Sequence, residues 1–82
     1  MPDDWKPLGN APVDLDSLRL FVRAVEQGSL SKVAGSSRLA LAAVSRRIRL
    51  LEDHYGVRLL TRTGRGVAPT QAGAVLLRHA HV

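Results

Sequence analysis

The chain has 82 residues, 45% of them hydrophobic, and a formal net charge of +5. This length allows one small domain with a modest core, and the absence of cysteine excludes a disulfide framework and cysteine-bearing metal sites. No apolar run approaches the ~20 residues of a membrane span and no signal peptide precedes the domain, so we expect a cytoplasmic protein with no membrane partner. The three histidines (His54, His79 and His81) share no helical face. We therefore expect no metal ion and no cofactor.

The positive charge is concentrated in the middle of the chain. Between Arg38 and Arg65 there are seven arginines against two acids, Glu52 and Asp53. Arginine can bind phosphate or guanine through two parallel hydrogen bonds, whereas lysine acts as a point charge. This pattern favours a nucleic acid over a membrane surface, because the basic segment lacks aromatic anchors.

The N-terminal part of the chain predicts an arm followed by a helix. Residues 1–13 contain three prolines and a glycine without apolar periodicity, which indicates an extended arm. From Asp14 to Val25 apolar residues recur at helical spacing, with Asp14 or Asp16 in the position of an N-cap or first-turn acid. Gly28 is placed to end this helix.

A short second helix is expected in the stretch SLSKVAGS, which starts at Ser29. Ser29 is the expected N-cap, and Leu30, Val33 and Ala34 are expected to face inward. Gly35 and the two serines after it are expected to break the helix.

A third helix is expected in LALAAVSRRIRLLE, residues 39–52, running to about His54 and ending at Gly56. Its apolar positions fall on one stripe when the sequence is placed on a helical wheel at about 100° per residue. The opposite face combines small residues with arginines. The stripe consists of Val44, Ile48 and Leu51, and the opposite face of Ala42, Ser45, Arg46, Arg49 and Asp53.

After Gly56 the apolar period shortens towards two. The stretches VRLLTRT and GVAPT flank the turn Gly64-Arg65-Gly66, which predicts a β-hairpin. Thr70 is then expected to cap a last helix, QAGAVLLRHAHV, which contains no stop signal. We therefore expect the chain to be the N-terminal part of a longer protein.

This order of elements is that of a mainly α, winged helix-turn-helix fold. It has a three-helix core, a short two-stranded β wing and a C-terminal linker helix. The predicted boundaries are residues 14–69 for the winged domain and 70–82 for the start of the linker helix.

Residues 15–82 resemble the N-terminal DNA-binding domain of LysR-type transcriptional regulators. The resemblance rests on LRLFVRAVEQGSLSKVA, AVSRRIRLLEDHYGVRLLTRTGRG and PTQAG, which follow the family's spacing without an insertion. It implies a bacterial transcription factor, not an enzyme, that binds double-stranded DNA at a pseudo-palindromic operator as a homodimer. The full-length proteins often form tetramers and bind a small-molecule effector in a C-terminal domain, which would follow residue 82. The resemblance also places the recognition helix, about residues 41–54, in the major groove and the wing, residues 61–67, at the minor groove.

The chain departs from the family pattern where the recognition helix begins. Ala40-Leu41-Ala42 replaces the usual Ser or Thr, then Gln, then Pro or Ser, so the N-cap hydroxyl and a base-reading glutamine are missing. Leu41 is expected either to pack against the protein or to contact a thymine methyl group. Ser37 replaces a usual core leucine, which predicts a rebuilt turn.

The recognition helix supplies the predicted base contacts. Arg46 is the best candidate, with two hydrogen bonds to guanine, and a phosphate contact is its alternative. Ser45 can donate to a base or a phosphate, or face solvent, and Ala42 shares the base-facing surface. Arg49 is predicted to bind phosphate, and Arg47 to form a structural or peripheral salt bridge.

Phosphate contacts are also predicted at the start of the second helix and in the wing. Ser29, Ser31 and Lys32 suit phosphate binding, although capping alone would explain Ser29. Arg62 is predicted to contact the DNA backbone, and Arg65, between two glycines, to enter the minor groove.

Four apolar residues are candidates for dimerisation: Leu20, taken as facing outward from the first helix, and Val75, Leu76 and Leu77 of the last. Completion of the intradomain core is an equal alternative for each.

A winged-helix module for protein interaction is the alternative function. An enzyme lacks a catalytic constellation, since the adjacent acids Glu52 and Asp53 are expected to be solvated surface charges.

Overall fold

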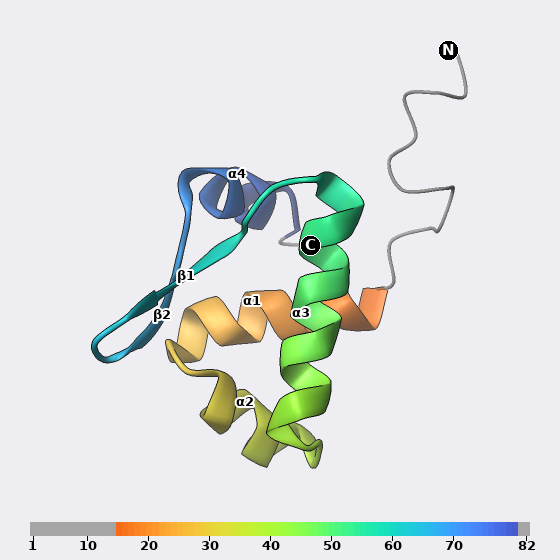
Figure 1. Ribbon diagram of the computed structural model, residues 1–82, viewed down its shortest axis with the longest axis vertical. Coiled ribbons are helices and arrows are strands. Elements are labelled where there is room, and N and C mark those ends of the chain that lie inside the picture. The colour runs from red at the N-terminus through yellow and green to blue at the C-terminus, as the bar shows by residue number, and fades with distance from the viewer. Residues whose placement is uncertain (1–14, 81–82) are drawn as a thin grey trace.

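A computed structural model describes residues 15–80, so the expected arm, Asp14 and residues 81–82 lie outside the described part. The elements follow in the order α1 (Leu15–Gln27), α2 (Leu30–Ser37), α3 (Leu41–Tyr55), β1 (Leu60–Thr63), β2 (Gly66–Pro69) and α4 (Gln71–Ala80). In Figure 1, α3 crosses α1, α2 lies below them, the hairpin projects to one side and α4 lies at the opposite end from α2. The predicted mainly helical, winged helix-turn-helix fold is confirmed.

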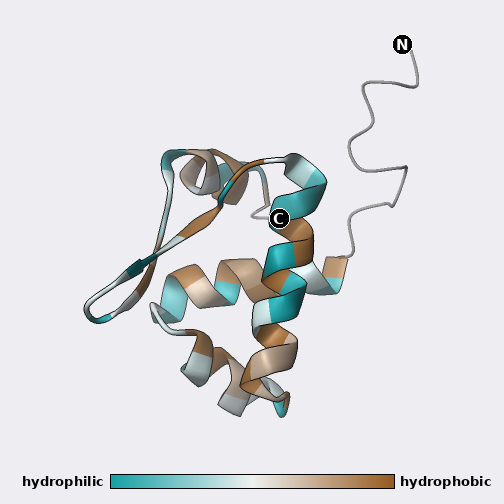
Figure 2. Cartoon of the chain, viewed as in Figure 1, coloured by the Kyte–Doolittle hydropathy of each residue, from teal (hydrophilic) through white to brown (hydrophobic). Residues whose placement is uncertain are grey.

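The core lies where the three crossing helices meet the base of the hairpin. Phe21 and Ala24 of α1, Val33 of α2 and Val44 of α3 are completely buried. In Figure 2, α3 carries both brown and teal residues along its length, so its surface is divided between apolar and polar positions. Burying a side chain such as Phe21 contributes about 1.5–3 kcal/mol relative to leaving it exposed. The fold is therefore held mainly by the helical stripes that the sequence predicts.

Gly28 and Ser29 form the connection between α1 and α2, as predicted. Gly28 adopts φ +67, in the left-handed region, and its N–H donates to the carbonyl of Ala24 over 2.8 Å. The Ser29 hydroxyl oxygen accepts a hydrogen bond from the Lys32 N–H at 3.2 Å and caps α2. The turn is thus fixed by its own local hydrogen bonds.

The expectation that Gly35 and the following serines break α2 is wrong. The helix continues to Ser37 and ends at Arg38, which adopts φ +57. Arg23 of α1 explains the longer helix, because its guanidinium donates to the hydroxyls of Ser36 at 2.7 Å and Ser37 at 3.0 Å. Ser37 thus makes a polar contact with α1, and the rebuilt turn stays a prediction.

α3 begins without a side-chain cap and ends at a glycine. Ala40 forms no side-chain capping bond, as its methyl group requires, and only its carbonyl bonds to the helix, where it accepts from the N–H groups of Ala43 at 3.0 Å and Val44 at 3.1 Å. Gly56 closes the helix at φ +69. The predicted helix is therefore confirmed, with one residue, Tyr55, beyond the expected end.

The wing is an antiparallel hairpin in which Thr63 pairs with Gly66, so that Gly64 and Arg65 form the loop. Its second strand is fixed to the turn between α1 and α2. The Val67 N–H donates to the Gly28 carbonyl over 3.0 Å, and a Cβ added at Gly66, whose φ is +146, would overlap that carbonyl oxygen. The wing therefore lies against the helical core at its base.

Thr70 caps α4, as predicted. Its hydroxyl oxygen accepts from the Gly73 N–H at 3.0 Å, and its hydroxyl donates to the Arg58 carbonyl at 2.6 Å. A Cβ added at Gly73 would overlap the carbonyl of Leu59, so α4 packs closely on the segment before β1. Within residues 15–80 no helix has both the length and the apolar character to cross a lipid bilayer.

Candidate nucleic-acid interface

The two predicted faces of α3 are present in the structure. Val44, Ile48 and Leu51 are at most 4% exposed and point into the core. The opposite face is open to solvent at Ala42, Arg46 and Arg49, whereas Ser45 is half-buried. The core stripe holds the helix in place and leaves the arginine-bearing face accessible.

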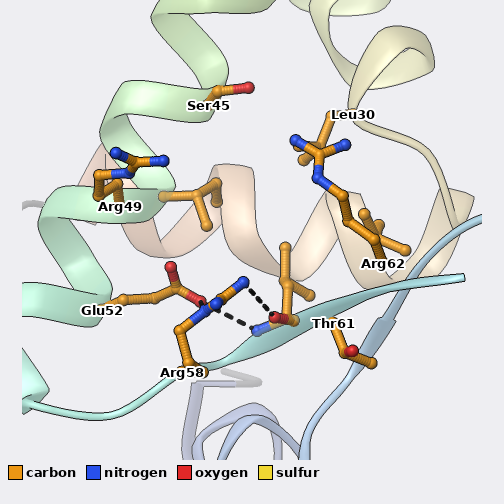
Figure 3. Close-up of a pocket in the computed structure, with 10 residues that line it drawn as sticks. Leu30, Ser45, Arg49, Glu52, Arg58, Thr61 and Arg62 are labelled. Carbon is orange, nitrogen blue, oxygen red and sulfur yellow. Dashed lines mark hydrogen bonds and ion pairs between the residues drawn. The ribbon is translucent and has the colours of Figure 1, made fainter.

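A small groove of about 90 Å³ lies between α3, the start of α2 and the wing. Ser45 and Arg49 line it from α3, Arg62 from β1 and Leu30 from α2. Figure 3 shows the guanidinium groups of Arg49 and Arg62 on opposite sides of this groove, with Ser45 on the α3 side. The fold thus brings together two arginines that belong to different elements and that the sequence assigns separately to phosphate.

The arginines of this surface form no ion pairs within the part of the chain that the structure describes. Among residues 15–80, the side chains of Arg46, Arg49, Arg62 and Arg65 form no ion pair or hydrogen bond. An exposed guanidinium without a protein partner keeps all its donors for an anion. We define the arginine surface as Arg46 and Arg49 of α3 with Arg62 and Arg65 of the wing.

Glu52 fixes the wing relative to α3, and its reading as a solvated charge is wrong. One carboxylate oxygen accepts the N–H groups of Leu59 at 2.8 Å and Leu60 at 3.2 Å. The same oxygen lies 3.4 Å from Nε of Arg58, and the Glu52 side chain is only 12% exposed. Glu52 therefore binds the chain where it leaves α3 and enters β1, while Asp53 is exposed as expected.

At the start of α2, Ser31 and Lys32 are exposed and Ser29 is half-buried. The Ser29 oxygen serves as the helix cap, which leaves its hydroxyl hydrogen for a further acceptor. At the tip of the wing Arg65 is exposed, and its N–H donates to the Thr63 hydroxyl oxygen over 3.2 Å. These residues are accessible, and their contacts with DNA stay predictions.

The candidate dimerisation residues separate into different environments. Leu20 is 6% exposed and belongs to the core, so its assignment as an outward-facing residue is wrong. α1 contacts four other elements, namely α2, α3, β2 and α4. Most of its circumference is therefore covered, including the side that carries Leu20. Leu76 and Leu77 are partly buried against the core, whereas Val75 is 42% exposed. Val75 is therefore the candidate that is most accessible to another chain.

Sequence reasoning missed the contacts of Glu52 and Arg23. Both residues bond to groups outside their own helix, and their only sequence signal is a polar residue at a position next to the apolar stripe of a helix. Arg47 is half-buried, and its predicted salt bridge stays a prediction. Within residues 15–80 no three His, Asp or Glu side chains gather in a way that could hold a metal ion.

Comparison with known proteins agrees with this geometry. Residues 15–74 match the sequence model described as bacterial regulatory helix-turn-helix protein, lysR family. An HTH-type transcriptional regulator of Xanthomonas campestris pv. campestris is 46% identical over 66 residues, which cover 80% of this chain and 19% of that protein. The nitrogen assimilation regulatory protein nac of Klebsiella aerogenes is 41% identical over 68 residues, covering 83% of this chain and 22% of that protein. The chain thus spans about a fifth of the length of these relatives.

Solved structures show the same fold. The BenM DNA-binding domain in complex with benA site 1 DNA has a TM-score of 0.76 and 37% identity, covering 82% of this chain and 78% of that one. CbnR, a LysR family transcriptional regulator, has a TM-score of 0.77 and 30% identity, covering 82% of this chain and 23% of that one.

Proposed function

Because the chain belongs to the lysR family of bacterial regulatory helix-turn-helix proteins, we propose that it binds double-stranded DNA sequence-specifically, as part of a transcriptional regulator. The family consists of regulators, and similar domains are found bound to DNA. The observation that carries the proposal is the arginine surface, whose side chains lie on the recognition helix and the wing and have no partner among the residues that the structure describes. A positive surface of this kind replaces the counterions of DNA phosphates.

In this proposal α3 enters the major groove with its arginine-bearing face towards the bases. Arg46 binds a guanine through O6 and N7, the commonest specific contact of arginine with DNA. Ser45 and Ala42 are the small neighbours that let the backbone approach and that complete the base-facing surface. The small size of Ser45 supports this role, because a larger side chain there would hold α3 away from the base edges in the major groove.

Phosphate contacts flank α3 on the sides of α2 and the wing. Arg49 and Arg62, on the two sides of the groove, bind the backbone of one DNA strand. Ser29, Ser31 and Lys32 bind it at the start of α2, where exposed N–H groups and a lysine attract anions. Arg65 at the tip of the wing enters the minor groove, where a narrow groove concentrates negative potential.

The whole protein is proposed to bind as a homodimer to a pseudo-palindromic operator, with tetramers as a further assembly. Two copies related by a twofold axis place two recognition helices on successive half-sites about one helical turn of DNA apart. Val75 on the exposed side of α4 supports pairing through this helix. A small-molecule effector would bind in the part of the protein that the relatives possess beyond this domain. DNA as the partner favours a cytoplasmic location.

The test begins with selection of a preferred duplex from a random library, followed by titration of that duplex and of a random one at the same salt concentration. Arg46→Ala is expected to weaken the selected duplex by about 1–3 kcal/mol and the random one far less, because it removes a base contact. Arg49→Ala should weaken both in similar proportion, because it removes a phosphate contact.

Arg19→Ala is the matched control, since it removes an exposed arginine of α1 that belongs neither to the arginine surface nor to α4, the helix proposed to pair the protomers. It should leave both affinities near those of the unchanged chain. Equal proportional losses for Arg46→Ala on both duplexes would refute the base contact. No preference for any duplex would refute sequence-specific binding and favour the winged-helix protein-interaction module.

A further inference from the structure

Leu41, the first residue of α3, does not pack into the domain. Its side chain is 48% exposed, and it is not among the residues that form or cover the core. The neighbouring Ala40 and Ala42 are also exposed, and Ala40 supplies no capping hydrogen bond. Within residues 15–80 the start of the recognition helix is therefore an apolar surface open to solvent, and Leu41 does not pack into the core there.

This exposed leucine is continuous with the proposed DNA-binding surface. Leu41, Ser45 and Arg49 are spaced four residues apart, so they lie in one row along α3. Ser45 and Arg49 line the groove opposite Arg62. A DNA duplex that contacts Ser45 and Arg49 along this row therefore also contacts Leu41 at its start.

The chemistry of a leucine restricts what it can recognise on DNA. The N-terminal residues of a recognition helix are those that reach base edges in the major groove. The leucine side chain can neither donate nor accept a hydrogen bond, and the only methyl group that a base edge presents in this groove is the thymine 5-methyl. Contact between the two removes both apolar surfaces from water.

We propose that Leu41 is a specificity-determining residue that selects a thymine in each half-site by packing against its 5-methyl group. The inference rests on the proposed binding of α3 in the major groove. In this proposal the exposed apolar start of α3 is part of the recognition surface. Leu41 then prefers the thymine methyl group, whereas a hydrogen-bonding side chain at this position would prefer a donor or acceptor of a base.

Leu50 is the natural comparison, because it is an exposed leucine of the same helix. It is 54% exposed and lies on a different side of α3 from the row of Leu41, Ser45 and Arg49. A substitution there removes the same amount of apolar side chain without touching the proposed contact. It therefore separates recognition of a methyl group from a general effect of surface hydrophobicity.

The experiment replaces thymines of the selected duplex by deoxyuridine, one position at a time in both half-sites, which removes only the methyl group. Dissociation constants are measured by fluorescence anisotropy at one salt concentration. For the unchanged chain we expect one position at which affinity falls about fourfold per half-site, the effect of one buried carbon. Leu41→Ala should bind the thymine and deoxyuridine duplexes equally, and Leu50→Ala should keep the fourfold difference.

Two results would overturn the proposal while leaving sequence-specific DNA binding intact. One is an unchanged chain that is insensitive to deoxyuridine at every position. The other is a Leu41→Ala variant that keeps the full sensitivity, which would assign the methyl contact to another residue. Failure of the chain to prefer any duplex over random DNA is a separate result, which refutes the proposed function and this inference with it.

Discussion

Replacing Glu52 by alanine is expected to destabilise the domain far more than an ordinary surface substitution. The change leaves the N–H groups of Leu59 and Leu60 without the acceptor that now lies 2.8 and 3.2 Å away. Both residues are at most 5% exposed, and an unsatisfied buried donor costs about 1–3 kcal/mol. The Arg58 ion pair adds little, because the Arg58 side chain is 73% exposed and well screened.

Water that enters at the partly open edge of Glu52 will satisfy some of this loss. We therefore expect the free energy of unfolding to fall by about 2–4 kcal/mol, which is a large part of the stability of a small domain. Urea denaturation monitored by circular dichroism measures this difference directly. Glu52→Gln keeps a neutral oxygen acceptor and should lose less than half as much.

Asp53→Ala is the matched control, because it removes a neighbouring carboxylate of the same helix that is exposed to solvent. Its effect should stay within about 0.5 kcal/mol. If Glu52→Ala also stayed within that range, the reasoning would be refuted, because the two N–H groups would then have found other acceptors without cost.

Four further predictions concern DNA binding and the glycines. The logarithm of the affinity for duplex DNA should fall with the logarithm of salt concentration at a slope of about −0.9 per phosphate neutralised, and a flat profile in anisotropy titrations would contradict phosphate contacts from the arginine surface. Arg65→Ala should weaken binding most for duplexes with a flanking A-tract, and equal losses with and without the A-tract would exclude a minor-groove contact. Gly66→Ala should destabilise the domain by at least about 1–3 kcal/mol, since it combines φ +146 with overlap of the Gly28 carbonyl. Gly35→Ala, in a helix with nothing nearby, should stabilise by about 0.5–1 kcal/mol in thermal or urea unfolding, and a loss there would show that Gly35 has a role of its own.

The features that the sequence predicted correctly are those that depend on local interactions. The stripe of Val44, Ile48 and Leu51 follows from helical periodicity, and Gly28 and Gly56 end helices because glycine adopts positive φ without strain. Thr70 caps α4 through an N–H three residues away. Each of these interactions lies within a few residues of the chain, so a short stretch of sequence contains all its determinants.

The errors occurred where distant segments meet. Gly35 looks like a helix breaker until Arg23 of another helix binds the hydroxyls of Ser36 and Ser37. Leu20 looks outward until α2, α3, β2 and α4 are all placed around α1. Glu52 resembles any surface acid, because its partners come from a segment whose path depends on the tertiary fold.

The candidate site could be predicted for the same reason as the helices. The arginine-bearing face of α3 follows from the period of one helix, and its exposure is confirmed. The groove shared by Arg49 and Arg62 could not be predicted, because it depends on the angle at which the wing leaves the core. Which base or phosphate each side chain contacts remains a prediction, since it depends on how DNA is placed against this surface.

The hydrogen bond from Val67 to Gly28 has a consequence for the order in which the domain folds. The three core helices follow one another directly in the chain, so their packing closes only short loops. The bond from Val67 to Gly28 joins the wing to the end of α1, so it closes a much longer loop. Loop closure costs entropy that only the completed contact returns, so the wing should dock after the helices have packed. In the native state the wing should also be the first part to detach from the helices. The Val67 amide should therefore exchange its hydrogen with solvent faster than the amides of Phe21 and Val44.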